Sequence, residues 1–295
     1  MSETELEFQL VKTNGITLHA VTAGPRNGPL VVLLHGFPEF WYGWRNQIKP
    51  LAEAGYRVLV PDQRGFNKSQ KPEGIEHYTL DTLRDDVIGL IKLYNREKAH
   101  VIGHDWGGAV AWHLASTRPE YVETLIPINI PHPAIMPKAM LTIPLQWLRS
   151  SYMAFFQLPE WPEKVLSADH YEGMAKGIKF SASKGDAFTR DDLETYKEAW
   201  AQLGAMTAML NWYRAIRAGL PEGFAHPEKV TVPTRMIWGV NDPFLSKKLA
   251  KKSIEHCEDG TLTFVGEATH WVSHEQPEIV NQLIAKYLSN QVVVG

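Results

Sequence analysis

An acidic side chain framed by glycines is the strongest chemical signal in this 295-residue sequence. Asp105 lies within the run Gly103–Gly108, which follows an apolar stretch at His100–Ile102 and precedes the helix-like segment Ala109–Thr117. The order glycine, X, nucleophile, X, glycine between a strand and a helix is typical of a nucleophile elbow, whose crowded backbone needs glycine on both sides. We therefore predict that Asp105 is a nucleophile. A simple helix-capping aspartate would not require the flanking glycines.

The choice of aspartate at the elbow indicates which reaction it performs. A carboxylate is ionised at neutral pH and can attack a saturated carbon by displacement, whereas a serine hydroxyl needs a base and suits attack on an acyl carbon. The product of displacement is an alkyl ester of Asp105 itself. Water must then hydrolyse this ester, so a general base and an oxyanion hole are needed for the second step.

Two further residues follow the elbow in the chain order nucleophile, acid, base. Asp242 stands in a polar turn at the end of an apolar run, and His270 stands in a loop near the last such run. We predict that His270 activates water and that Asp242 orients its imidazole. His274 is the competing base, and the side chain of His104 is expected to turn away from the site.

Backbone N–H groups and aromatic side chains complete the predicted site. In an elbow of this kind one oxyanion donor follows the nucleophile and the other follows an early strand, which indicates the N–H groups of Trp106 and Phe37. Trp41, Phe37 and Trp106 are expected to line an apolar pocket. Trp212 either joins them or only anchors neighbouring helices.

Short apolar runs bounded by Gly, Pro or Asp indicate the elements that position these residues. The runs are Leu30–Leu34, Arg57–Val60, His100–Ile102, Thr124–Ile128, Thr234–Trp238 and Thr261–Val265. Several lack polar alternation, which is typical of strands buried on both faces of a parallel sheet. They alternate with segments of helical spacing such as Asp81–Tyr94, so we predict an α/β fold with a mostly parallel, doubly wound sheet.

The alternation stops near residue 131 and resumes near residue 231. The intervening segment contains helix-like stretches rich in aromatic residues, among them Trp147–Phe156 and Leu193–Ile216. It is too long for a structureless loop, and we interpret it as a helical cap over the carboxyl ends of the strands, where open α/β sheets hold ligands. We expect a core domain at residues 1–131 and 231–295 and a cap domain at residues 132–230.

Composition excludes several classes of partner. The formal net charge is −3, so there is no electrostatic reason to expect nucleic acid or an anionic membrane as partner. The single cysteine, Cys257, excludes an intramolecular disulfide, and no metal or cofactor is expected. The segment Met1–Leu10 is acidic rather than signal-like and no apolar run reaches membrane length, so we expect a cytoplasmic protein. The sequence leaves a homodimer open.

Over nearly its whole length the sequence resembles the soluble bacterial epoxide hydrolases of the α/β-hydrolase fold. The segments that carry the resemblance are His35–Arg45, Pro61–Ser69, Gly103–Gly108 and Asn211–Arg214. The resemblance implies that a small-molecule epoxide and water are the substrates. It also implies that two cap tyrosines hydrogen-bond the epoxide oxygen and protonate it as the ring opens. Tyr213 falls on one of these positions, Tyr152 looks like the other, and Tyr196 is the reserve candidate.

Two alternative functions are weighed against this interpretation. Haloalkane and haloacetate dehalogenases of the same fold also use an Asp nucleophile and a His base. The haloalkane enzymes share a tryptophan at the position of Trp106, but they usually carry asparagine where Phe37 stands, and the fluoroacetate enzymes usually carry arginine where Trp106 stands. A non-catalytic receptor or binding module is the alternative of another class; such chains often lose part of the triad, which this sequence retains.

Overall fold

The computed structural model describes residues 5–143, 145–219, 221–224 and 228–291. Within these ranges an 8-stranded sheet has the order β1-β2-β4-β3-β5-β6-β7-β8. The strands are β1 Glu7–Thr13, β2 Ile16–Ala23, β3 Leu30–Leu34, β4 Arg57–Pro61, β5 Ala99–His104, β6 Val122–Ile128, β7 Thr234–Gly239 and β8 Gly260–Val265. Pairing is antiparallel for β1 with β2 and for β2 with β4, and parallel from β4 through β8. The predicted mostly parallel sheet is therefore confirmed.

The first two strands form a hairpin that the sequence analysis missed. They are joined by Asn14 and Gly15, both with positive φ (43° and 72°), a conformation that an Asn-Gly pair adopts readily in a two-residue hairpin turn. The Asn-Gly pair would have indicated this hairpin in the sequence. The strand leading to Phe37 is consequently the third in the chain, and it lies inside the sheet between β4 and β5.

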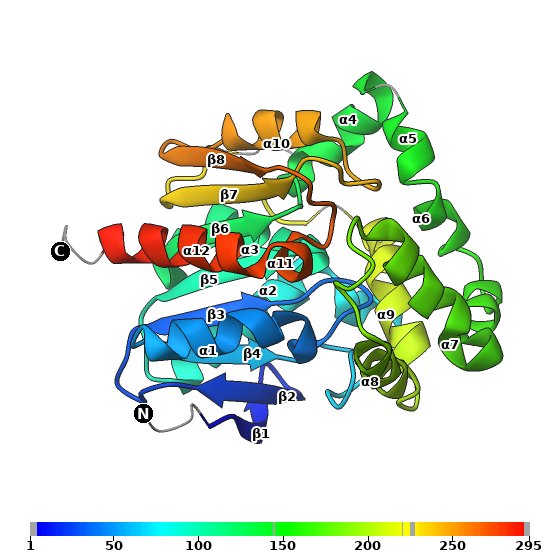
Figure 1. Ribbon diagram of the computed structural model, residues 1–295, viewed down its shortest axis with the longest axis horizontal. Coiled ribbons are helices and arrows are strands. Elements are labelled where there is room, and N and C mark those ends of the chain that lie inside the picture. Colours follow the sequence, from blue (N-terminus) through cyan, green and yellow to red (C-terminus); the bar gives the residue numbers. More distant parts are fainter. Residues whose placement is uncertain (1–4, 144, 220, 225–227, 292–295) are drawn as a thin grey trace.

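Helices cover both faces of the sheet (Figure 1). One face carries α1 Arg45–Glu53, α11 Val272–Glu275 and α12 Pro277–Gln291, and the other carries α2 Leu80–Leu93, α3 Asp105–Thr117 and α10 Lys247–Ile254. Along β3, Val31 and Leu33 pack into the first layer while Val32 and Leu34 pack into the second. Because side chains alternate across a strand, a strand covered on both faces must be apolar throughout.

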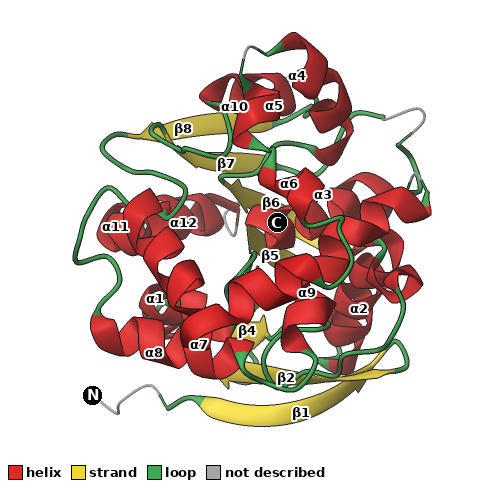
Figure 2. Cartoon of the chain, turned by 90° about the vertical axis from the view of Figure 1, so that its right-hand side faces the viewer, coloured by secondary structure: helices red, strands yellow, loops and turns green. Residues whose placement is uncertain are grey.

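The chain leaves the sheet after β6 and returns at β7, and in between it is helical. The elements are α4 Met136–Thr142, α5 Gln146–Arg149, α6 Tyr152–Phe155, α7 Trp161–Ser181, α8 Arg190–Trp200 and α9 Ala205–Arg214. Short 3-10 helices are η1 Trp41–Trp44, η2 Ile75–Tyr78, η3 Pro119–Tyr121, η4 Pro133–Ile135 and η5 Ala215–Ala218. Figures 1 and 2 show α4 to α9 gathered at one end of the sheet, beyond the carboxyl ends of the parallel strands.

Two helix-like stretches in this region are each divided in the structure. The stretch 147–156 becomes α5 and α6, separated by Ser150 and Ser151. The stretch 193–216 becomes α8 and α9. Helix α8 ends at Trp200, and Gly204, with a left-handed φ of 75°, directly precedes α9. Within the described ranges no helix combines the length and apolar character that a membrane crossing requires.

Candidate active site

Asp105 sits on a sharp turn between β5 and α3. Its φ of 50° lies in the left-handed region, a strained conformation for a residue other than glycine. A Cβ on Gly103 would lie 2.4 Å from the carbonyl oxygen of Gly107, and one on Gly107 would lie 2.2 Å from the carbonyl oxygen of Leu34. A Cβ on Gly36 would come within 2.4 Å of the Asp105 Cβ. The turn therefore needs glycine at positions 103 and 107, and the facing loop after β3 needs it at position 36.

The two oxygens of the Asp105 carboxylate have different surroundings. Oδ1 accepts a hydrogen bond of 2.9 Å from the backbone N–H of Phe37, and Oδ2 lies 3.4 Å from Nε2 of His270. Asp105 is also the first residue of α3, whose amino-terminal N–H groups favour negative charge. Burial alone would raise the pKa of Asp105, but the hydrogen bond and charge of His270 hold it below its ordinary value. The carboxylate is therefore ionised at neutral pH.

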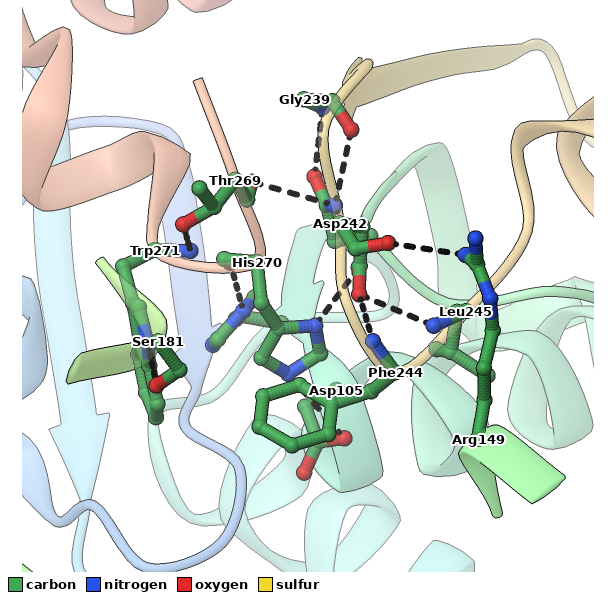
Figure 3. Close-up of polar contacts among 12 residues, drawn as sticks. Asp105, Arg149, Ser181, Gly239, Asp242, Phe244, Leu245, Thr269, His270 and Trp271 are labelled. Carbon is green, nitrogen blue, oxygen red and sulfur yellow. Dashed lines mark hydrogen bonds and ion pairs between the residues drawn. The ribbon is translucent and has the colours of Figure 1, made fainter. Parts of the chain in front are cut away.

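His270 lies between two carboxylates (Figure 3). Its Nδ1 is 2.8 Å from Oδ2 of Asp242, whose Oδ1 accepts the backbone N–H groups of Phe244 and Leu245 at 2.8 and 2.9 Å. Burial lowers the pKa of His270, but the charges of Asp242 and Asp105 outweigh it and raise the pKa to about 10. In this state the imidazole carries its proton at neutral pH.

Asn129, directly after β6, supports this pair and was missed in the sequence. Its Nδ2 donates to Oδ2 of Asp242 at 2.7 Å and to the carbonyl of Thr269 at 3.3 Å, while its Oδ1 accepts the N–H of Gly239 at 2.8 Å. One side chain thereby ties together the ends of β6 and β7 and the loop that carries His270. The available signal was a polar residue immediately after a predicted strand, at the edge where Asp105 and Asp242 also stand.

The alternative base His274 and the reserve tyrosine Tyr196 both bind a buried glutamate, Glu39. Glu39 accepts the hydroxyl of Tyr196 and pairs with Nε2 of His274, both at 2.7 Å, and it lies 3.0 Å from Nδ1 of His104. Burial raises the pKa of Glu39, but the charge and hydrogen bonds of the two histidines hold it well below its ordinary value. The side chain of His104 also reaches the carbonyl of His270 at 2.8 Å. Thus His270, and neither His274 nor Tyr196, is brought to Asp105.

Tyr213 on α9 and Tyr152 at the start of α6 lie over the elbow. The Tyr213 ring contacts those of Trp106 and Phe37, with centroids 5.1 and 5.3 Å apart, and the Tyr152 ring lies 6.0 Å from it. Burial raises the pKa of both phenols above the ordinary value, and the charge of Asp105 adds to the effect. Both hydroxyls therefore keep their protons at neutral pH.

Other polar side chains fix the tyrosine-bearing helices and were not predicted. Gln157 donates to the carbonyl of Tyr213 at 3.0 Å. Arg214 donates to the carbonyl of Phe156 at 3.0 Å and forms a two-pronged ion pair with Glu163 at 2.6 and 2.9 Å. These contacts bind α9 to the segment that follows α6, and so set the spacing of the two tyrosines.

The predicted aromatic lining is only partly assembled as expected. Trp212 contacts Trp106, with centroids 5.9 Å apart, and donates its indole N–H to the carbonyl of Arg64 at 2.9 Å, so it lies beside the predicted lining and also anchors α9 to the loop after β4. The ring of Trp41 instead packs edge-on against Phe8 on β1, with centroids 5.3 Å apart.

Two phenylalanines that were not predicted to line the site, Phe156 and Phe244, contact the tyrosines and the base. Phe156 contacts Tyr213 at 4.9 Å between centroids. Phe244 lies 5.3 Å from the His270 ring and 6.0 Å from that of Tyr152. Together with Phe37 they surround the space between the tyrosines and the base with apolar rings.

Known proteins that are similar to this chain have the α/β-hydrolase fold, and several of them are named epoxide hydrolases. A family model described as alpha/beta hydrolase fold matches residues 29–277. AB hydrolase superfamily protein YfhM of Bacillus subtilis is 63% identical over 97% of this chain and 99% of its own length. Epoxide hydrolase 4 of Mus musculus is 39% identical over 95% of this chain and 79% of its own length. The crystal structure of a Bacillus megaterium epoxide hydrolase superposes with a TM-score of 0.87 at 30% identity, covering 95% of this chain and 100% of the other.

Proposed function

Because this chain belongs to the epoxide hydrolases of the α/β-hydrolase fold, we propose that it converts epoxides to vicinal diols through a covalent ester on Asp105. The main support for the proposal is the set of groups around the Asp105 carboxylate. The ionised carboxylate of Asp105 lies near two protonated phenols, Tyr152 and Tyr213, whose pKa its charge helps to raise, and its Oδ2 lies 3.4 Å from Nε2 of His270. An epoxide needs a nucleophile and an acid together, since an alkoxide is a poor leaving group.

In the first step, Oδ2 of Asp105 attacks an epoxide carbon and the carbon–oxygen bond of the ring breaks. The epoxide oxygen takes a proton from the tyrosine pair, which leaves a tyrosinate and an alkyl ester. Oδ2 is assigned the attack because Oδ1 already accepts the N–H of Phe37. Esterification removes the negative charge beside His270, so the pKa of His270 falls and its proton passes to the tyrosinate.

In the second step, neutral His270 takes a proton from water while the water oxygen attacks Cγ of the ester. The negative charge that develops on Oδ1 is stabilised by the N–H groups of Phe37 and Trp106. Collapse of this intermediate expels the diol, which carries away Oδ2 and receives the proton from His270. The new carboxyl group then loses its proton to His270, and the resting charges are restored.

The fate of oxygen tests this mechanism. In a single turnover in ¹⁸O-water, with enzyme in excess over a terminal epoxide, we expect the label on Asp105 and an unlabelled diol. Mass spectrometry of the peptide containing Asp105 and of the diol measures both. Label in the first-turnover diol with unlabelled Asp105 would mean direct attack by water and would refute the ester.

A substrate panel separates the proposal from dehalogenation by the same residues. Terminal and aryl epoxides are compared with haloalkanes and fluoroacetate, scoring diol and halide release. We expect diol from the epoxides and no halide. Halide release without diol would reverse the assignment, and neither product from a folded protein would favour a binding module.

The division of the chain follows from the same scheme. We propose that residues 132–230 form a cap that supplies the two tyrosines and shields the ester from bulk water. Residues 1–131 and 231–295 then form the core that supplies Asp105, Asp242 and His270. The substrates are a small epoxide and water.

A further inference from the structure

A buried glutamate outside the proposed machinery joins the cap to the loop of the base. Glu275, at the end of α11, is 2% exposed. From the core, its carboxylate accepts the backbone N–H of Thr269 at 2.6 Å and the Thr269 hydroxyl at 2.9 Å. From the cap, it accepts the backbone N–H and, at 2.9 Å, the hydroxyl of Ser183, in the connection between α7 and α8. Thr269 directly precedes His270.

Neighbouring contacts strengthen this junction on both sides of His270. The indole N–H of Trp271 donates to the Ser181 hydroxyl at 2.8 Å (Figure 3), and the Ser183 hydroxyl reaches the carbonyl of Glu267 at 2.8 Å. Lys184 donates to the backbone carbonyl of Glu275 at 2.8 Å. We call these residues, Ser181, Ser183 and Lys184 with Glu267, Trp271 and Glu275, the cap–loop junction.

Side chains of the core bind the same His270 loop at other backbone atoms. Asn129 binds the carbonyl of Thr269, and His104 binds the carbonyl of His270. The carbonyls of Thr269 and His270 are thus held by core side chains, whereas the N–H and hydroxyl of Thr269 are held by Glu275, which also binds Ser183 of the cap. The loop is fixed completely only when the cap segment 181–184 is seated on it.

We propose that Glu275 is a positioning residue that aligns His270 through Thr269 and makes the ester-hydrolysing step depend on a seated cap. The inference rests on the proposed function, in which His270 accepts a proton from water in that step alone. Ring opening uses Asp105 and the tyrosines, which the junction does not contact in the hydrogen bonds of the described residues. The second step therefore slows when the junction is broken, and the first does not.

Replacing the carboxylate with an amide is a sharp test of the junction. In Glu275→Gln, an NH₂ group at the position of Oε2 would face the N–H of Thr269, and one at the position of Oε1 would face the N–H of Ser183. In either orientation the amide NH₂ donor therefore faces a backbone N–H donor, and the two cannot form a hydrogen bond. The side chain keeps its size, so the substitution changes only the charge and the hydrogen bonding of this group.

The two half-reactions are measured separately by rapid quench, with intact mass of the ester as signal. In Glu275→Gln we expect ester hydrolysis to slow on the order of 10- to 100-fold, as for a misplacement near 1 Å, with the alkylation rate within about twofold of wild type. Ser183→Ala removes only the Ser183 hydroxyl, and it should slow ester hydrolysis by a smaller factor than Glu275→Gln does. Glu278→Gln and Ser167→Ala, at exposed positions, are the matched controls.

Hydrogen exchange tests the coupling independently of any substrate. Amides of residues 266–275 should exchange faster in Glu275→Gln and in Ser183→Ala than in wild type and both controls. Equal slowing of both half-reactions, or unchanged exchange in Ser183→Ala, would overturn the inference. If wild type forms no ester with any epoxide, the proposed function fails, while the exchange result still decides whether the cap holds the loop.

Discussion

The charge on His270 changes during the proposed cycle because one of its two acidic neighbours is consumed. In the resting site Asp242 and Asp105 raise the pKa of His270 to about 10, although burial opposes them. An imidazolium cannot accept a proton from water. Esterification neutralises Asp105 and leaves Asp242 as the only acidic partner described for the ring, so the base becomes available only after the first step.

Asp105→Asn should therefore lower the pKa of His270, because the amide resembles the ester in charge and size. NMR titration of the imidazole measures this pKa in both proteins. In wild type we expect the proton to be retained until the pH rises toward 10. In the variant, deprotonation should occur at lower pH. An unchanged pKa would show that Asp105 does not control the base.

His270→Gln should still form the ester but fail to release product. The side chain can no longer accept a proton, and general-base catalysis contributes about 10²- to 10⁴-fold. Intact mass after addition of an epoxide should show an adduct that persists, located on Asp105 by peptide mapping. A folded variant that turns over at the wild-type rate would remove His270 from the mechanism. His256→Gln, outside the site, is the control.

At the scale of elements, short helices with specific ties present the two tyrosines. Tyr152 begins the four-residue α6, and Tyr213 lies near the end of α9. Such a short helix has little stability of its own. The ion pair of Arg214 with Glu163, and its hydrogen bonds to backbone carbonyls after α6, hold the tyrosine-bearing segments together.

Arg214→Met should loosen this arrangement. Glu163 would be left half-buried without its partner, and breaking such a pair costs about 3 kcal/mol of the free energy of unfolding. Urea denaturation measures the loss, and single-turnover alkylation should slow because Tyr213 shifts. Lys164→Met, which breaks an exposed pair with Glu160, is the control and should cost below about 0.5 kcal/mol. Equal effects of the two substitutions would refute the special role of Arg214.

At the scale of the whole molecule, two buried tryptophans dock α8 and α9 on the loops that follow β3 and β4. Trp200 on α8 donates its indole N–H to the carbonyl of Pro38 at 2.6 Å, and Trp212 on α9 does the same to Arg64 at 2.9 Å. Both acceptors follow strands that end at the edge of the sheet near Asp105. Packing of α8 and α9 on the sheet therefore depends on contacts with the loops that carry Pro38 and Arg64.

Trp200→Phe should weaken docking with little change in apolar burial. The Pro38 carbonyl would lose its partner in a buried setting, at a cost of about 1–3 kcal/mol. We expect lower stability in urea and a higher KM for epoxides, since the turn carrying Phe37 lies beside the lost bond. Trp161→Phe, at a position 67% exposed, should change neither. A wild-type KM and stability for Trp200→Phe would contradict this account.

What the sequence by itself determined is local. The glycines around Asp105 and the apolar runs depend on residues close together in the chain, and the order of Asp105, Asp242 and His270 is read along the chain without knowledge of any contact. The strands β3 to β8 and the mostly parallel sheet were predictable because burial on both faces leaves a continuous apolar run. Local signals also existed for the hairpin β1–β2, in its Asn-Gly turn, and for the break before α9, in Gly204.

Only the tertiary structure decided which distant side chains meet. Asn129, Glu39 and Glu275 act through partners far away in sequence, and a lone polar residue does not announce a partner that folding brings to it. The same reason explains why Trp41 packs on Phe8 while Phe156 and Phe244 surround the site. Elbow chemistry follows from residue type and spacing, but the surroundings of the base consist of contacts between segments that are distant in the chain, such as Asp242 with His270 and Glu275 with Ser183.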